Sequence, residues 1–533
     1  MGSSFRQDTF AMPAYRSNSP GAAPAGPNST SRRTFLAGLA GAATVLSGCG
    51  GGSSSSPSDN IASPNQPTEP DPGPDIDPPV EPPEPPAPFP PRGVHASIEE
   101  SSLTSRSITW FTDTSHAPAQ RLEYDQEPLL EGQQNTPVFL HQRQASSEAT
   151  FGVDAQTHRI KIDGLDPDKP VRYRVGSPSG GWSPVYQLTP INTQNWSFVH
   201  YGDQGVSVRA QRVTEEILKQ PRDLAIIAGD LSYADGEQSV WDTWFDLVEP
   251  LLANTITMAA AGNHESKDGD GLQSGKAFKS RLTHPDPLLN NLNPNPGSTY
   301  YGFDIGRVHF FVSSAGALID DFTLAEELIN LEIDLAKAAL RRARGELDFI
   351  ILIQHYPIWT DQDGRSPANL TLVALQENIL LRYGVDLLLV GHDHIYQRSV
   401  PMGFGIPSRL GYVQVLTGTG GQSVRLFDDN GIQRWSASEF VGIGFSRFEV
   451  EPGRIKGYFY GAAPQGLGDD VRQTVTDPFA LHDEFEVEQR DWLACQNCAL
   501  PARPASELLQ DFPALVAHTR ERNRRAMEHH SHG

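Results

Sequence analysis

Five short segments of this chain carry side chains of the kinds that bind metal ions in proteins, namely aspartate, asparagine, tyrosine and histidine. Each segment follows an apolar run or forms its end. One segment alone would be a weak signal, because Gly-Asp turns and nearby histidine pairs are common. Five such segments in this order predict that their side chains form one common metal-binding site. They are Gly202-Asp203-Gln204-Gly205, Gly229-Asp230-Leu231-Ser232-Tyr233, Gly262-Asn263-His264-Glu265, Leu352-Ile353-Gln354-His355 and Gly391-His392-Asp393-His394.

The apolar runs beside these segments have the length and composition of buried strands. Stretches of helical character separate them, which predicts an α/β domain over residues 190–460. Ligands in such a domain gather at the carboxyl ends of the strands, where the glycines let the backbone turn and approach closely. The predicted strands cover 198–201, 224–227, 256–259, 349–352 and 386–390.

Residues 92–189 have a different pattern, in which apolar and polar side chains alternate over 107–112, 158–162 and 171–175. A period of two predicts half-buried strands and therefore a small β-sandwich. The run from Leu165 to Tyr173 resembles the tyrosine corner of fibronectin type III domains. No ligand cluster is evident here, so we expect a structural module, with glycan or protein binding as the alternative.

The N-terminus resembles an export signal. Arg32 and Arg33 stand directly before the apolar stretch 35–46, which is too short to cross a bilayer core of about 30 Å. This order resembles a twin-arginine signal peptide over residues 1–48. Cys49 completes a segment that resembles a bacterial lipobox, which implies a lipid anchor. The expected location is the periplasm or cell envelope of a bacterium.

Residues 49–91 would then form a tether between the lipid and the folded domains. Of the 35 residues from 57 to 91, 15 are proline and none is lysine or arginine. Proline at this density favours an extended polyproline II chain and cannot form a hydrophobic core.

Taken together, the five segments resemble the metallophosphoesterase superfamily, and Tyr233 makes them similar to its purple acid phosphatases. Ala234-Asp235, residues 241–244, and Tyr396 with Arg398 agree with that family. The resemblance covers about residues 92–460. It implies a fibronectin type III-like sandwich followed by an α/β domain in which two packed mixed sheets are flanked by helices.

The resemblance also implies a centre of two metal ions. A ferric ion would be held by Asp203, Tyr233 and His394, and a divalent Zn, Mn or Fe ion by Asn263, His355 and His392. Asp230 would bridge the two ions. Carboxylate and phenolate oxygens suit hard Fe(III), whereas imidazole suits the divalent ion.

The implied reaction is hydrolysis of phosphate monoesters, in which a metal-bound hydroxide attacks phosphorus. The alternatives are hydrolysis of phosphodiesters or nucleotides by the same centre, and a surface-anchored binding protein with a degenerate site. All seven ligand positions are filled, which argues against degeneration. The substrate, the divalent metal and the oligomeric state are left open.

Two residues outside the ligand set are expected to contact substrate. His264 matches a family histidine that binds phosphate and helps to protonate the leaving oxygen. The plant enzymes carry adjacent histidines where this chain has Gly364 and Arg365. Arg365 could bind a phosphate oxygen, and Asp361 or Asp363 could act as acid. Alternatively, this stretch is only a turn.

Composition removes some classes of function. The net charge of −23 argues against sequence-independent nucleic-acid binding. Gly418-Thr419-Gly420-Gly421 lacks the Lys-Ser/Thr pair of a Walker A loop and is expected to be structural. The extension 461–533 is expected to be partly disordered. In it, Cys495 and Cys498 form either a local disulfide, which we favour, or reduced or metal-bound thiols, and the histidines at 529, 530 and 532 are unassigned.

Overall fold

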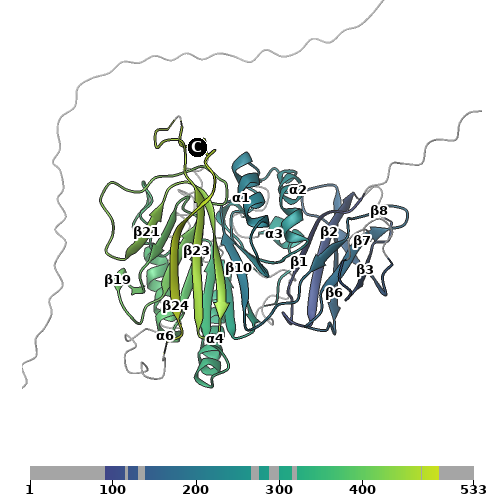
Figure 1. Ribbon diagram of the computed structural model, residues 1–533, viewed down its shortest axis with the longest axis horizontal. Coiled ribbons are helices and arrows are strands. Elements are labelled where there is room, and N and C mark those ends of the chain that lie inside the picture. The colour runs from purple at the N-terminus through teal and green to yellow at the C-terminus, as the bar shows by residue number, and fades with distance from the viewer. Residues whose placement is uncertain are drawn as a thin grey trace, which may run out of the picture. The chain divides into compact units, whose positions relative to one another are not determined.

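A computed structural model describes residues 90–113, 118–129, 138–265, 275–286, 299–314, 321–469 and 471–490 (Figure 1). The predicted signal peptide, Cys49, the tether up to residue 89, Cys495, Cys498 and the terminal histidines lie outside these residues and stay predictions. Among the described residues, no helix is both long and apolar enough to cross a membrane.

The first domain is the predicted β-sandwich, and its alternating runs lie within three of its strands. Its core is formed by buried residues such as Trp110, Leu122 and Val175. The strands are β1 (Arg92–Ser97), β2 (Ser105–Asp113), β3 (Arg121–Asp125), β4 (His141–Gln144), β5 (Ser146–Ala149), β6 (Ala155–Asp163), β7 (Val171–Ser177), β8 (Gly181–Trp182) and β9 (Tyr186–Leu188).

The first half of the second domain alternates strands with helices. Ser207 caps α1, because its side chain accepts a hydrogen bond from the backbone of Ala210. The elements are β10 (Trp196–Tyr201), α1 (Val208–Leu218), β11 (Leu224–Ala228), α2 (Val240–Leu252), β12 (Ile256–Ala260), a single 3-10 turn (Asn263–Glu265), α3 (Lys276–Arg281), β13 (Tyr301–Ile305), β14 (Val308–Ser313) and α4 (Asp321–Ala343).

The second half completes both sheets of this domain. A short π-helical stretch, Val373–Glu377, joins α5 to α6. The elements are β15 (Phe349–Gln354), α5 (Leu370–Leu372), α6 (Asn378–Tyr383), β16 (Leu387–Val390), β17 (Tyr396–Ser399), β18 (Met402–Gly403), β19 (Ile406–Pro407), β20 (Val413–Thr417), β21 (Ser436–Phe440), β22 (Ile443–Glu451), β23 (Arg454–Ala462) and β24 (Ala480–Glu488).

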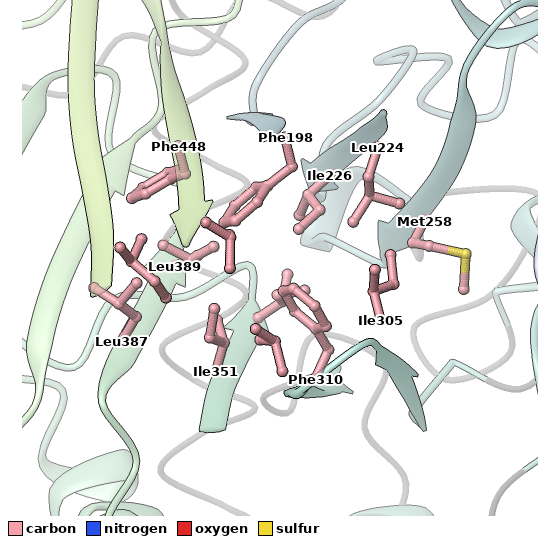
Figure 2. Packing of buried hydrophobic residues seen from close by; sticks show 14 of the residues in the cluster. Phe198, Leu224, Ile226, Met258, Ile305, Phe310, Ile351, Leu387, Leu389 and Phe448 are labelled. Carbon is pink, nitrogen blue, oxygen red and sulfur yellow. The ribbon is translucent and has the colours of Figure 1, made fainter. Parts of the chain in front are cut away.

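Two mixed sheets pack face to face and are flanked by helices, as the resemblance implied. Alternation along the strands explains the layers: Phe198 and Ile226 point into the core between the sheets, whereas Ile227 points to the side covered by α1 and α2. Figure 2 shows Phe198 and Ile226 facing Phe310 and Ile351 of the other sheet. The helices α4 and α6 cover the far side of the second sheet.

The sandwich is joined to the α/β domain by a shared sheet, which the sequence did not indicate. One ten-stranded sheet runs β24-β23-β22-β10-β11-β12-β1-β2-β6-β5, so β1 continues directly from β12. Ala96 pairs with Ile256 across this junction. The seven-stranded sheet runs β13-β14-β15-β16-β20-β17-β21, and a separate sheet, β4-β3-β7-β8 with β9 beside β7, closes the sandwich.

The predicted tyrosine corner is wrong. The Tyr173 hydroxyl donates to the carbonyl oxygen of Ala253 at 2.6 Å, beyond the end of α2, rather than to the loop before its own strand. Glu249 of α2 strengthens the same junction by accepting a hydrogen bond from the Gly93 backbone at 2.6 Å. The tyrosine therefore fixes the sandwich to the α/β domain.

The α/β domain also continues past the boundary expected at residue 460. Strand β24 pairs with β23 over its whole length and forms the edge of the ten-stranded sheet. Asp483 of β24 accepts hydrogen bonds from the Tyr396 hydroxyl at 2.7 Å and from Arg398 Nε at 2.6 Å. Two residues that supported the family resemblance thus hold the last strand in place.

Candidate metal centre

The five predicted segments meet at the carboxyl ends of parallel strands from both sheets. β10, β11 and β12 are parallel neighbours, and so are β15, β16 and β20. The ligands follow the strands by one to five residues, which places all seven predicted ligands in one region. They are Asp203, Asp230, Tyr233, Asn263, His355, His392 and His394.

One half of the site gathers around His355. Its Nε2 atom lies 3.1 Å from Asn263 Oδ1, 3.2 Å from His392 Nδ1 and 3.1 Å from Asp230 Oδ2. Asp230, His355 and His392 are all buried, and their ligand atoms lie within 4.8 Å of one another. Asn263, His355 and His392 are the three residues expected to hold the divalent ion, and Asp230 is the expected bridge.

The other half gathers around Tyr233. Its hydroxyl oxygen lies 3.1 Å from Asp203 Oδ1 and 3.2 Å from His394 Nε2, and the last two atoms are 3.5 Å apart. These are the three residues expected to hold Fe(III). The second carboxylate oxygen of Asp203 accepts the backbone N–H of His392 at 2.7 Å, so the two halves are joined through the backbone.

The arrangement of lone pairs fits a cation. Nδ1 of His355 donates to the carbonyl oxygen of Ala228 at 2.8 Å, which leaves the Nε2 lone pair directed at Asp230. Nδ1 of His394 likewise donates to Ser423 at 2.7 Å and leaves Nε2 directed at Tyr233. Asp230 Oδ2 is buried and accepts no hydrogen bond from the described residues. Such convergence is unfavourable unless a positive charge lies between the atoms.

The pKa values follow from the same geometry. Burial lowers the pKa of His355, but Asp230 beside it raises this pKa to about 9 overall, so that a proton supplies the positive charge in the absence of metal. Burial raises the pKa of Tyr233 well above its usual value, and Asp203 adds to the effect. The phenol therefore stays protonated unless a strong Lewis acid binds its oxygen.

The backbone at the site is strained in a consistent way. Asp203, Asp230, Tyr233 and His392 have φ values of 60°, 51°, 57° and 73°, in the left-handed region that non-glycine residues rarely adopt. Each such residue costs on the order of 1–3 kcal/mol, and such residues cluster at functional sites. Packing around the strand ends must hold the ligands in place against this cost.

Two glycines give the ligand carboxylates the space they occupy. A Cβ atom at Gly262 would lie 2.1 Å from Asp230 Oδ1, and one at Gly391 would lie 2.6 Å from Asp203 Oδ2. Larger residues there would displace a ligand.

The glycine-rich run 418–421 supports a ligand loop. Gly420 packs on the loop that carries Asp203, and its backbone N–H donates to the carbonyl oxygen of Gly202 at 2.9 Å.

His264 lies beside both halves of the site, as its predicted role requires. Its Nε2 is 3.9 Å from Asp230 Oδ2, and its ring centroid is 4.2 Å from that of Tyr233. Its Nδ1 is 2.5 Å from Asp235 Oδ1. Burial lowers the pKa of His264, but Asp230 and Asp235 together raise it above the usual value, which favours the acid form. Sequence reasoning gave Asp235 no role, although its position two residues after Tyr233 was a signal.

Glu265 was also missed as a functional residue. Its buried carboxylate accepts backbone N–H groups of Asp230, Leu231 and Gly262, at 2.9, 2.9 and 2.7 Å. Burial raises the pKa of Glu265 to about 7, with Asp230 adding to the rise. One carboxylate therefore ties together two of the ligand loops.

The stretch expected to replace the plant histidines is a turn, closed by a hydrogen bond from Arg365 N to Gln362 O at 3.1 Å. Arg365 is nevertheless beside the site, because its Nε lies 3.1 Å from Asp393 Oδ1, between the two histidine ligands. Asp361 is directed to Gln397, and Asp363 is exposed. No described contact brings either aspartate to the ligands, so the geometry favours His264 as the acid.

Two family profiles match the chain. The calcineurin-like phosphoesterase profile covers residues 198–396, which include all seven predicted ligands. The profile of the purple acid phosphatase N-terminal domain covers residues 91–190, which is nearly the extent predicted for the sandwich.

Known purple acid phosphatases are similar to this chain in sequence and fold. Purple acid phosphatase 21 of Arabidopsis thaliana is 25% identical over 343 residues, which cover 62% of this chain and 72% of the relative. Purple acid phosphatase 18 of the same plant is 26% identical over 339 residues, covering 62% and 71%. The solved purple acid phosphatase of yellow lupin (Lupinus luteus) seeds shares the fold, with a TM-score of 0.59, 18% identity and coverage of 78% of this chain and 77% of that one. The two profiles and these relatives together support the assignment of the chain to the purple acid phosphatases, within the calcineurin-like phosphoesterases.

Proposed function

We propose that this protein is an acid phosphatase that hydrolyses phosphate monoesters at a centre of Fe(III) and a divalent Zn, Mn or Fe ion. The observation that carries the proposal is the position of Tyr233. Its hydroxyl lies 3.1 Å from Asp203 Oδ1 and 3.2 Å from His394 Nε2, in a group separate from the one that Asp230, Asn263, His355 and His392 form. A phenolate paired with a carboxylate suits ferric iron.

Each side chain has a task in this scheme. Asp203, Tyr233 and His394 would hold the iron, Asn263, His355 and His392 the divalent ion, and Asp230 would bridge them. Two such ions supply charge neutralisation for the phosphate oxygens and activation of water. His264, held by Asp235, donates a proton to the leaving oxygen, while Glu265 keeps the Asp230 loop in position.

The test is metal analysis together with a visible spectrum of the purified protein and of Tyr233→Phe. We expect iron and a second metal in the wild type, and a visible absorption band from phenolate-to-iron charge transfer. Phe keeps the ring volume but removes the oxygen, so the band should disappear while the fold survives. Tyr301→Phe is the matched control, since Tyr301 is a buried tyrosine that bonds only to Ala259 among the described contacts.

A Tyr233→Phe protein that keeps the wild-type band would place Tyr233 among packing residues and the protein in another metallophosphoesterase branch. Activity assays on 4-nitrophenyl phosphate and bis(4-nitrophenyl) phosphate complete the test. We expect the monoester to be the better substrate. A clear preference for the diester would favour the phosphodiesterase alternative.

A further inference from the structure

A loop over residues 421–428 borders the Tyr233 half of the site. The backbone N–H of Gln422 donates to the carbonyl oxygen of Asp203 at 3.0 Å, and that of Arg425 donates to the carbonyl oxygen of His394 at 3.3 Å. Ser423 in between accepts the Nδ1 hydrogen bond of His394. Arg425 is thus attached directly to a residue of the predicted iron site.

The turn that carries Arg365 lies alongside this loop. Asp363 N donates to Leu426 O at 2.9 Å, Asp428 N donates to Asp361 O at 2.8 Å, and Gln362 forms an antiparallel bridge with Phe427. Continued along the chain, this register brings the turn at Gly364 level with Arg425. The two arginines, one from each segment, therefore belong to the same side of the metal centre.

Within the described part of the chain, Arg425 differs from the other arginines around this loop in having no partner for its guanidinium. Arg365 pairs with Asp393, Arg472 pairs with Asp469, and Arg209 donates to the carbonyl oxygens of Gly421 and Gln473. The described residues offer the Arg425 side chain no hydrogen bond and no ion pair, although it is half-buried. Burial lowers its pKa, and the charges of Arg472 and Arg365 act in the same direction.

A half-buried guanidinium without a partner is unfavourable in the ligand-free protein and is stabilised when an anion binds to it. A half-buried cation has lost part of its hydration, and two nearby cations add repulsion. A bound anionic group would relieve both effects, and the flat guanidinium can bind carboxylate or phosphate through two N–H groups. The protein as a whole repels anions through its net charge of −23, so a local cation beside the site matters more.

We propose that Arg425, with Arg365 beside it, forms a subsite for a second anionic group, carried by the leaving group of the substrate. The proposal rests on the proposed phosphatase function and names its substrate class: phosphate esters or anhydrides whose leaving group bears a further carboxylate or phosphate. The scissile phosphate would be bound by the predicted metal centre and His264. Arg425 is attached to His394 through its backbone, at the border of the predicted centre, and would be left to bind the rest of the substrate.

The experiment compares substrates that differ in one charge. Phenyl phosphate and 4-carboxyphenyl phosphate share a ring and a scissile phosphate, and inorganic pyrophosphate carries a second phosphate instead of a carboxylate. For each, kcat and KM are measured with the metal-loaded wild type, Arg425→Gln and Arg425→Lys. Arg409→Gln is the control, because Arg409 is exposed on the β19–β20 loop and its substitution removes the same charge.

We expect the wild type to prefer the doubly anionic substrates. In Arg425→Gln, the kcat/KM ratio of 4-carboxyphenyl to phenyl phosphate should fall about tenfold, mainly through KM, because one charged hydrogen-bond pair is lost. Arg425→Lys should keep part of the preference, and Arg409→Gln all of it. A fall confined to pyrophosphate would support a subsite that accepts phosphate only.

Two results would overturn the subsite. If Arg425→Gln lowers kcat/KM equally for phenyl and 4-carboxyphenyl phosphate, Arg425 binds the scissile phosphate. If it changes kcat/KM for none of the three substrates, Arg425 has no part in binding. A wild type that hydrolyses no substrate contradicts the proposed function instead. Calorimetric binding of phenylphosphonate and 4-carboxyphenylphosphonate to the wild type and Arg425→Gln then decides on the subsite by itself.

Discussion

His309 and His355 are both buried beside carboxylates. His309 lies in β14, and His355 directly follows the neighbouring strand β15. The two ring nitrogens of His309 bind different partners: Nδ1 lies 2.8 Å from Asp304 Oδ1, and Nε2 lies 2.6 Å from Asp334 Oδ2. His355 instead uses Nδ1 for a backbone carbonyl and turns Nε2 toward Asp230 and two further ligand atoms. Histidine and aspartate therefore form two different kinds of cluster in this protein.

The difference lies in where the lone pairs point. Around His309 the carboxylates lie on opposite sides of the ring, and Arg341 binds the second oxygen of Asp304 at 2.8 Å, so the charges are satisfied within the protein. Around His355, its ligand atom and those of Asp230 and His392 lie within 4.8 Å of one another. The backbone of Asp230 and of His392 is in the left-handed region. Convergence with strain, rather than composition, distinguishes a metal site from a structural ion cluster.

The largest expected effect comes from breaking the convergence itself. Asp230→Ala removes the carboxylate that is expected to bridge the two ions and that lies 3.1 Å from His355 Nε2. We expect metal content to fall well below two ions per chain and kcat to fall by at least about 1,000-fold, because the two-ion arrangement supplies most of the charge stabilisation. Elemental analysis and steady-state kinetics measure both, and circular dichroism checks folding.

A folded Asp230→Ala protein with wild-type metal content and rate would contradict the assignment of the bridge. The matched variant is Asp334→Ala, which removes a buried carboxylate from the His309 cluster. It should destabilise the protein but leave the metal content of the folded fraction unchanged.

The second prediction concerns the stability of the His309 cluster. Because both ring nitrogens face carboxylates, the ring must be an imidazolium to donate to both. Burial lowers the pKa of His309, but Asp304 and Asp334 raise it to about 9 overall. His309→Gln should therefore lower the free energy of unfolding at pH 6 by on the order of 3 kcal/mol, as breaking buried ion pairs does. Urea denaturation measures this loss.

The pH dependence of this difference follows from the sign of the shift. The folded pKa lies above the unfolded value of about 6.5, so the stabilisation is complete below pH 6.5 and is lost as the pH rises through about 9. The gap between wild type and His309→Gln should therefore be largest at pH 6 and much smaller at pH 10. A gap that stays constant or widens with pH would show that the cluster does not depend on the charge of His309.

The sequence predicted the site better than its surroundings. Ligand residues such as Asp203 and His392 were found because each follows a buried apolar strand, and parallel strands bring such positions together. The contact of Tyr173 with Ala253 and the pairing of β1 with β12 join segments far apart in the chain, and no local pattern records them. The same holds for β24, whose pattern gave no sign of its partner strand.

The residues that support the ligands were missed for a related reason. Glu265 stands out by the backbone N–H groups that it binds, and Arg425 by the lack of a side-chain partner among the described residues. Neither property is visible in the residue type. His309 shows the converse limit. Its aspartate partners lie five residues before it and 25 residues after it, and nothing in that spacing separates a structural cluster from a ligand set.

The smallest expected effect concerns Asp235, whose carboxylate lies against the His264 ring. Its carboxylate holds Nδ1 of His264 at 2.5 Å, so that Nε2 faces the site and carries the proton that a leaving oxygen needs. Asp235→Asn keeps the shape but removes the charge. The kcat for phenyl phosphate should fall about tenfold, less than the roughly 100-fold or more that proton transfer contributes, because His264 itself stays in place. The loss should be smaller for 4-nitrophenyl phosphate, whose leaving group needs less protonation. Asp429→Asn, which removes an exposed carboxylate, is the control. If Asp235→Asn slows both substrates equally, Asp235 shapes the site rather than positioning an acid, since only a role in protonation depends on the leaving group.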